Sequence, residues 1–204
     1  WVAGGAGGNT MAYSINGINW YGVPNSTSIF SSEVRHIAWN GNVWIAVGNA
    51  TNTIAYSYDG MNWKGLGATV FSSQGKGVVW GGNIWVACGD TPNSLAYSFN
   101  GITWIGLGKY TFTGACEFIG WNGKMFVGVG SGGNTIAYSY NGIKWFGATN
   151  LFNSSGLWGI DWNGSMWIVS GNWNYAMAYS YDGVIWYGIP AGSSINYSHS
   201  LKWV

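Results

Sequence analysis

One pattern is written five times along this chain. The triplet Ala-Tyr-Ser begins at Ala12, Ala55, Ala96, Ala137 and Ala178, so consecutive copies are 43 and then three times 41 residues apart. No linker or shift in composition interrupts the repeat across the 204 residues, and we therefore expect a single domain covering residues 1–204. A period near 40 residues is typical of proteins in which every copy forms one small sheet.

Each copy contains four short runs with strand character. In the second copy these runs are 34–39, 43–48, 53–59 and 62–66, and the turns between them are built on Asn-Gly and Asp-Gly pairs. Such pairs tolerate the positive φ angles of tight hairpins. Helical periodicity is absent, so we predict an all-β, five-bladed β-propeller of four-stranded antiparallel blades with almost no helix. The continuous blades are expected to start near Val34, Gly75, Cys116 and Leu157.

The two ends of the chain complement each other in this repeat. Residues 1–3 match a second strand, and residues 201–203 match a first strand. We therefore predict that the C-terminal strand pairs into the N-terminal blade and closes the ring, which would leave no sheet edge exposed at the seam.

Most of the tryptophans fall into three repeat columns, which we expect to form the core. Each large aromatic side chain buries about 150–250 Å². The columns are Trp39, Trp80, Trp121, Trp162 and Trp203; Trp1, Trp44, Trp85 and Trp167, with Phe126 completing the set; and Trp20, Trp63, Trp104, Trp145 and Trp186.

Charge is scarce. Charged residues make up 6% of the chain, the net charge is +1, and Arg35 is the only arginine. This excludes electrostatic recognition of nucleic acid, which needs clustered Lys and Arg. Apolar stretches fall short of the ~20 residues that cross a bilayer, so we expect no membrane insertion. As a closed ring the chain is expected to be a monomer.

The sequence offers few residues that could bind a metal or a cofactor. His36 and His199 are the only histidines, and the two cysteines, Cys88 and Cys116, stand in columns otherwise filled mostly by Val, Gly, Leu and Ser. We interpret both cysteines as small core residues, and nothing in the repeat requires their columns to meet. No metal and no cofactor is expected.

The segment Ser57-Tyr58-Asp59-Gly60-Met61-Asn62-Trp63 recurs in every copy and resembles the Asp-box repeat of sialidases and related propellers. It departs from that pattern because Asp or Asn directly precedes Gly, and Asn16, Asn100 and Asn141 replace the acid in three copies. The resemblance implies a structural turn between the third and fourth strands, so Asp59 and Asp182 are expected to be turn residues. Sialidase activity would need an arginine cluster that this chain lacks.

The five-bladed architecture is also similar to tachylectin-type lectins, whose sugar sites lie between neighbouring blades. That likeness concerns architecture alone, and no binding residue follows from it.

One repeat column varies in chemistry at the start of the first strand. It contains Arg35, Lys76, Glu117, Trp158 and His199. A solvated rim explains this variation, and within it Lys76 and Glu117 of adjacent blades are expected to pair. Asp161 and Lys202 are a second expected pair, across the closing seam.

These features favour a non-enzymatic binding module, and a hydrolase is the least favoured class. Sugars are recognised by aromatic faces beside amide and hydroxyl groups, so carbohydrate binding is the first hypothesis. Only Trp158 and Trp173 lie outside the three core columns, which predicts a glycan site made of Trp158, Trp173, Tyr175, Asn172 and Asn174. The alternative explanation is that the rings of Trp158 and Trp173 only pack on each other and cap the last blade. The alternative function is a structural or adhesive scaffold propeller, part of a coat, a fibre or an engineered symmetric module, that contacts other protein surfaces.

Overall fold

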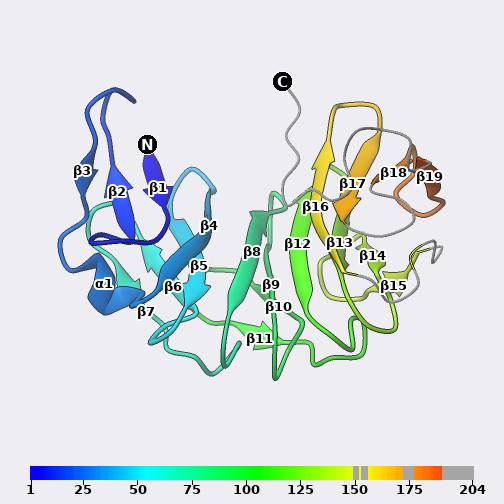
Figure 1. The fold of residues 1–204 in the computed structure, drawn as a ribbon, viewed down its shortest axis with the longest axis horizontal. Coiled ribbons are helices and arrows are strands. Elements are labelled where there is room, and N and C mark those ends of the chain that lie inside the picture. The colour runs from blue at the N-terminus through cyan, green and yellow to red at the C-terminus, as the bar shows by residue number, and fades with distance from the viewer. Residues whose placement is uncertain (149–151, 153–155, 172–176, 190–204) are drawn as a thin grey trace.

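The computed structural model describes residues 1–148, 152, 156–171 and 177–189. Within them the strands form five antiparallel sheets, and in every sheet the strands are consecutive along the chain (Figure 1). One single-turn helix, α1 (Ser26–Ile29), joins the first two sheets. None of the described residues forms a helix long and apolar enough to cross a membrane.

We number the sheets as blades 1 to 5. Blade 1 contains β1 (Val2–Gly4), β2 (Met11–Tyr13) and β3 (Tyr21–Gly22). Blade 2 contains β4 (Glu33–Trp39), β5 (Trp44–Asn49), β6 (Ile54–Ser57) and β7 (Lys64–Gly65). Blade 3 contains β8 (Gly75–Trp80), β9 (Trp85–Gly89), β10 (Leu95–Ser98) and β11 (Ile105–Gly106). Blade 4 contains β12 (Cys116–Trp121), β13 (Phe126–Gly130), β14 (Ile136–Ser139) and β15 (Phe146–Gly147). Blade 5 contains β16 (Leu157–Trp162), β17 (Trp167–Gly171), β18 (Met177–Ser180) and β19 (Tyr187–Ile189).

The blades follow one another along an arc, with the first strand of each on the inner side (Figure 1). Contacts run from β1 to β4, from β4 to β8, from β8 to β12 and from β12 to β16. This arrangement, and the blade starts at Glu33, Gly75, Cys116 and Leu157, confirm the predicted propeller. Blade 1 has three described strands rather than four, and the expected closing strand, 201–203, lies outside the described residues. Closure of the ring therefore stays a prediction.

The inner hairpin of each continuous blade is set by its turn. In blade 2 the Asn40 side-chain oxygen accepts hydrogen bonds from the N–H groups of Asn42 (2.9 Å) and Val43 (2.8 Å). Gly41 adopts a φ of 96°, which glycine reaches at no steric cost. The result is the cross-strand pair Trp39–Trp44 at the end of the hairpin, with ring centroids 4.8 Å apart.

Every inner strand from β4 to β16 carries a β-bulge at the same repeat position. In blade 2, Val34 pairs with Gly48 and His36 with Val47, so Arg35 between them has no partner in the ladder. The other three bulge residues are Lys76, Glu117 and Trp158. A bulge releases its extra residue from the regular packing of the sheet. This explains why the column varies from blade to blade.

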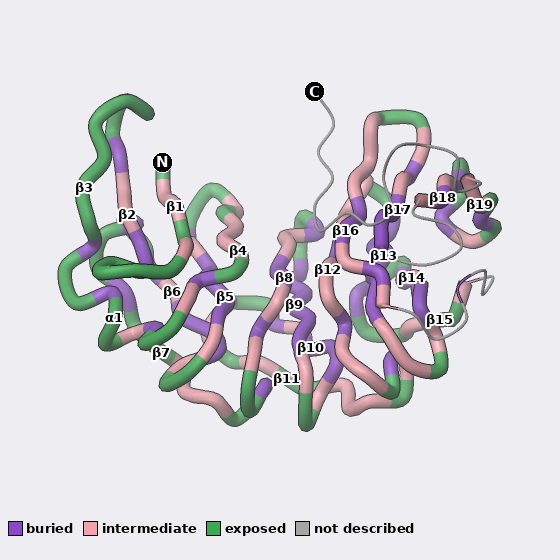
Figure 2. Tube along the Cα trace, in the orientation of Figure 1, coloured by how far each residue is buried: buried purple, intermediate pink, exposed green. Residues whose placement is uncertain are grey.

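The core lies between the blades, as the buried segments of Figure 2 show. The tryptophan prediction holds for Trp63, Trp85, Trp167 and Trp186, which are all buried. It is wrong for three others, since Trp1, Trp20 and Trp39 are 74%, 44% and 41% exposed.

The exposure of Trp1 and Trp20 follows from how this core is assembled, and that of Trp39 from its place at the end of a hairpin. A Cβ atom built on Gly120 of blade 4 would lie 2.8 Å from the Trp167 ring of blade 5, so this tryptophan column packs on the preceding blade. Trp1 belongs to the first blade, and no described residue forms a preceding blade on which its ring could pack. Trp20 belongs to the same end blade, and Trp39 lies at a hairpin end where stacking on Trp44 covers one face of its ring.

Candidate functional site

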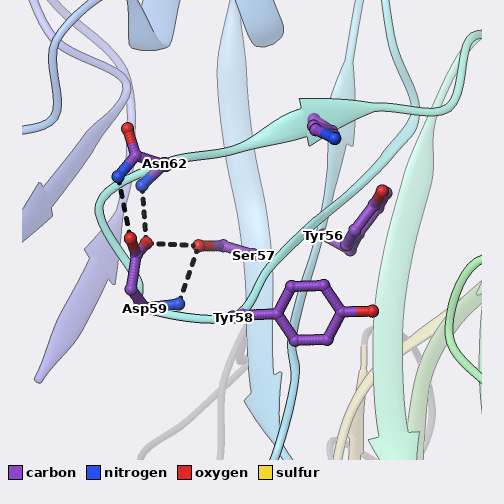
Figure 3. Close-up of a pocket in the computed structure, with 6 residues that line it drawn as sticks. Tyr56, Ser57, Tyr58, Asp59 and Asn62 are labelled. Atoms are coloured by element: carbon purple, nitrogen blue, oxygen red, sulfur yellow. Dashed lines mark hydrogen bonds between the residues drawn. The ribbon is translucent and has the colours of Figure 1, made fainter.

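The turn between the third and fourth strands of blade 2 is closed by Ser57 and Asp59 (Figure 3). One carboxylate oxygen of Asp59 accepts hydrogen bonds from the Ser57 hydroxyl (3.0 Å) and from the N–H groups of Met61 (2.8 Å) and Asn62 (2.7 Å). Its other oxygen accepts from the Asn62 side-chain amide (2.7 Å). Both oxygens of Asp59 are thus used within the turn.

The buried residues of this turn complete its hydrogen bonds. The Ser57 hydroxyl oxygen accepts from the N–H of Gly60 at 2.9 Å, and the Trp63 indole N–H donates to the Gly60 carbonyl at 3.0 Å. Gly60 has a φ of 75°. The other four blades repeat the Ser–Gly and Trp–Gly hydrogen bonds.

Asp and Asn are interchangeable at the centre of the turn. The side-chain oxygen of Asn141 in blade 4 accepts from Ile143 N–H (3.0 Å) and Lys144 N–H (2.9 Å), as Asp59 does from its equivalents. These hydrogen bonds explain why Asn replaces Asp in three blades. They support the structural interpretation of the turn over a catalytic one.

The two turn carboxylates have lowered pKa values. The backbone N–H of Asn62, its side-chain amide, the N–H of Met61 and the Ser57 hydroxyl hold the pKa of Asp59 well below its usual range. At Asp182 partial burial acts to raise the pKa, but the N–H groups of Ile185 and Val184 and the Ser180 hydroxyl outweigh it. Both groups are therefore ionised at neutral pH and committed to the turn.

A second repeat column, directly before the turn residue, is exposed in every blade. We call its four rings the exposed aromatic column: Tyr58 is 59%, Phe99 64%, Tyr140 62% and Tyr181 67% exposed. Ile15, the equivalent residue of blade 1, is 89% exposed. A large apolar side chain thus faces solvent at five equivalent positions.

The exposed aromatic column is held in place by the strand beneath it. Each ring packs edge-on against the tyrosine two residues earlier, as Tyr58 does on Tyr56, with centroids 5.8 Å apart and an interplanar angle of 80°. The other three pairs have centroid distances of 5.8–5.9 Å and angles of 77–78°. Edge-to-face packing is a preferred arrangement of aromatic pairs, so each exposed ring already has one packing partner within its own blade.

Blade 2 also has a hollow of about 150 Å³ beside this column (Figure 3). It is lined by Tyr56, Ser57, Tyr58, Asp59, Asn62 and Lys64. The hollow therefore combines two aromatic side chains with one fully bonded carboxylate, an amide and an ammonium group.

The glycan site expected from the sequence is only partly within the described structure. Trp158 is the bulge residue of β16 and is half-buried. The four other expected site residues, Trp173, Tyr175, Asn172 and Asn174, lie outside the described residues. The site as a whole therefore stays a prediction.

The two cysteine columns meet, which the sequence interpretation did not anticipate. Cys88 and Cys116 are both buried and free, and they belong to one core cluster between blades 3 and 4. Burial raises the pKa of the Cys116 thiol well above its usual range, and the neighbouring Cys88 thiol raises it further. The columns meet because the first strand of blade 4 packs against the second strand of blade 3. Across the described ranges, no three His, Cys, Asp or Glu side chains gather closely enough to hold a metal ion.

These blades, inner bulges and interlocked turns define the chain as a β-propeller. No family model and no curated protein matches the sequence. Among solved structures it is similar to the computationally designed protein Ika8, with 13% identity and a TM-score of 0.61 over 85% of this chain and 53% of that one. It is also similar to YCF48 bound to a D1 peptide, with 14% identity and a TM-score of 0.62 over 82% of this chain and 56% of that chain. YCF48 from Cyanidioschyzon merolae gives 17% identity and a TM-score of 0.61 over 92% and 68%.

These likenesses bear on the fold. The chain spans about half the length of the designed protein and of peptide-bound YCF48. They do not show a relation to Asp-box or tachylectin-type proteins, so those resemblances stay expectations of the sequence.

Sequence reasoning missed the exposed aromatic column as a functional feature. Its signal is present, because an aromatic residue stands between Ser and Asp or Asn in four of the five copies, as Tyr58 does between Ser57 and Asp59. Strand alternation alone did not separate these exposed rings from the tyrosines beneath them.

Proposed function

We propose that this chain is a non-enzymatic propeller scaffold that binds protein partners through the exposed aromatic column. The observation that carries the proposal is the exposure of a large apolar side chain at the same position of all five blades, between 59% and 89%. One such side chain on every blade gives a repeated set of contact points, and Tyr and Phe are enriched in the contacts between proteins.

The physical properties of the column suit protein recognition. Tyr and Phe have two χ angles, and packing on a strand tyrosine favours one ring orientation, which reduces the entropic cost of association. With five such positions on one rigid body, weak contacts act together when a partner reaches several of them.

Two further points support this function. The solved structure of YCF48 with a D1 peptide is a case of a similar fold in contact with a peptide. The carboxylates of Asp59 and Asp182 are engaged in turn hydrogen bonds, which favours a non-enzymatic role over a carboxylate-based hydrolase.

The test compares three immobilised proteins. They are the parent, a variant with Tyr58, Phe99, Tyr140 and Tyr181 replaced by Ser, and a control with the exposed Ile18 and Tyr110 replaced by Ser. We expect the parent and the control to retain the same proteins from an extract of the source organism, identified by mass spectrometry, and the column variant to lose them. Equal capture by the column variant, with its circular dichroism unchanged, would refute the proposal.

Carbohydrate binding is the second candidate. It is supported by the position of Trp158 at a bulge, which takes this residue out of the hydrogen-bonded ladder of the sheet. A glycan array probed with the same three proteins separates the two functions. Binding of one sugar class by the parent and by the column variant alike would favour the carbohydrate site and weigh against the protein scaffold.

A further inference from the structure

The third-strand tyrosine of every blade faces one residue of the outermost strand. The pairs, which share the same register, are Tyr13 with Tyr21, Tyr56 with Lys64, Tyr97 with Ile105, Tyr138 with Phe146 and Tyr179 with Tyr187. Directly opposite residues of an antiparallel pair lie on the same face of a sheet. The outer residue of each pair thus stands where it can cover the tyrosine.

In three blades that outer residue is an aromatic ring that packs on the tyrosine. The centroid distances are 5.7 Å for Tyr13–Tyr21, 5.6 Å for Tyr138–Phe146 and 5.4 Å for Tyr179–Tyr187, with interplanar angles of 35°, 29° and 28°. Three blades of the protein therefore show that a six-membered aromatic ring fits against this tyrosine.

Blade 2 departs from this arrangement. Its outer residue is Lys64, which lines the hollow together with Tyr56, Tyr58 and Asn62. Figure 3 shows these last three side chains. In blade 3 the branched side chain of Ile105 takes the equivalent position. The hollow is thus the place that an aromatic ring fills in blades 1, 4 and 5.

We infer that the blade 2 hollow binds an aromatic side chain of a protein partner, stacked on Tyr56 beside Lys64. The inference rests on the proposed function and specifies which group of the protein partner binds at blade 2.

The polar groups around the hollow suit such a ring. In blade 4 the Lys144 ammonium lies 5.2 Å from the centroid of the Phe146 ring, an attractive cation–π arrangement. Lys64 corresponds by register to Phe146 and not to Lys144. An incoming ring would displace the flexible Lys64 side chain, whose ammonium group can then lie beside the ring. The Asn62 amide nitrogen already donates to Asp59, which leaves its carbonyl oxygen to accept an N–H from the partner backbone.

The test is an NMR titration of 15N-labelled protein with N-acetyl-phenylalaninamide, with N-acetyl-leucinamide as the aliphatic control. We expect saturable shifts of backbone amides within residues 56–64 for the phenylalanine amide, and binding of the leucine amide at least about 10-fold weaker. The variant Lys64→Phe should fill the hollow as Phe146 does in blade 4 and abolish the shifts. The variant Phe146→Lys should open a second hollow, with new shifts within residues 138–146.

Three results would overturn the inference. They are equal binding of the two amides, retained shifts in Lys64→Phe, and shifts at the hollow with methyl glucoside in place of the phenylalanine amide. Failure of the inference is distinct from failure of the proposed function. If Lys64→Phe captures the same partner proteins as the parent with equal affinity, the proposed function is retained and the blade 2 hollow is not the place where the partner binds.

Discussion

The ammonium group of Lys76 lies 2.6 and 2.7 Å from the two carboxylate oxygens of Glu117. The two residues belong to β8 and β12, the inner strands of adjacent blades, and each is the bulge residue of its strand. Their side chains are 12% and 19% exposed, so the pair joins two blades in a partly dry environment. This confirms that Lys76 and Glu117 pair, but it is not the solvated contact expected of an open rim.

Breaking this pair on one side should destabilise the protein. Replacing Glu117 by Gln leaves the Lys76 ammonium without a full counter-charge, and we expect a cost of about 1–3 kcal/mol, below that of a fully buried pair. The double variant Lys76→Met, Glu117→Met should recover most of this loss. Urea unfolding of the parent, Lys76→Met, Glu117→Met and the double variant measures the coupling, and additive single effects would contradict an energetic pair.

The turn glycines are expected to couple backbone geometry to packing between blades. Gly142 has a φ of 74°, and a Cβ there would lie 2.7 Å from Val86 of the preceding blade, whereas Gly123 has a φ of 91° and no neighbour within 4 Å. Gly123→Ala should therefore cost only about 1–2 kcal/mol of backbone strain, and Gly142→Ala about 1–3 kcal/mol more. Equal melting temperatures for the two variants would show that the interface between the blades accommodates the added methyl group at no cost.

The turn carboxylates should make stability depend on acid. Because the pKa of Asp59 is lowered in the folded protein, the unfolded chain takes up a proton first, near pH ~4. The stabilisation is therefore complete above that pH and is lost as the pH falls further. Asp59→Asn and Asp182→Asn should change the free energy of unfolding little at pH 7. They should reduce the stability that is lost on acidification, which urea unfolding at pH 7 and below pH ~4 measures. A large loss at pH 7 would reopen a functional role for the carboxylates.

Closure of the ring can be tested at its predicted seam. Trp1 is 74% exposed, although its equivalents in blades 3 to 5 are buried against a preceding blade. If residues 201–203 supply the missing strand of blade 1, deletion of 201–204 should lower the melting temperature sharply or cause aggregation. The variant Trp1→Ser should then be similarly destabilised. A truncated chain that melts like the parent would show that the seam lies elsewhere.

The expected glycan site leads to one further pair of variants. Trp158→Ala and Trp173→Ala should each weaken sugar binding without changing the melting temperature if the two rings form a binding surface. Calorimetric titration and thermal unfolding of each variant give both quantities. A lowered melting temperature with affinity retained would assign the rings to packing.

The repeat predicted the blades because its period and its turn residues act locally. Asn40-Gly41 and Asp59-Gly60 fix hairpins wherever they occur, so strand order and blade starts follow from spacing. Hydrogen bonds within the turn shorten the third strand, because Asp59 accepts hydrogen bonds there instead of continuing the sheet. The third strand accordingly ends at Ser57, two residues earlier than expected.

What the repeat could not predict depends on contacts between copies. Alignment of the copies gives Trp1 and Trp85 the same column, yet one is 74% exposed and the other fully buried, because burial requires a preceding blade. The meeting of Cys88 and Cys116 likewise needs the offset between adjacent blades. The rings of the exposed aromatic column share a strand face with the tyrosines two residues earlier, so alternation does not separate the two sets. The greater exposure of Tyr58 depends on the turn that follows Ser57.

The brevity of the outermost strands has a consequence for the behaviour of the protein in concentrated solution. In blades 1 to 4 this strand is two residues long, and in blade 5 it is three. A neighbouring molecule therefore finds almost no free backbone ladder to extend, which is the step that seeds fibrils. For a chain with 6% charged residues, electrostatic repulsion is a weak safeguard, and colloidal stability depends on the geometry of its edges.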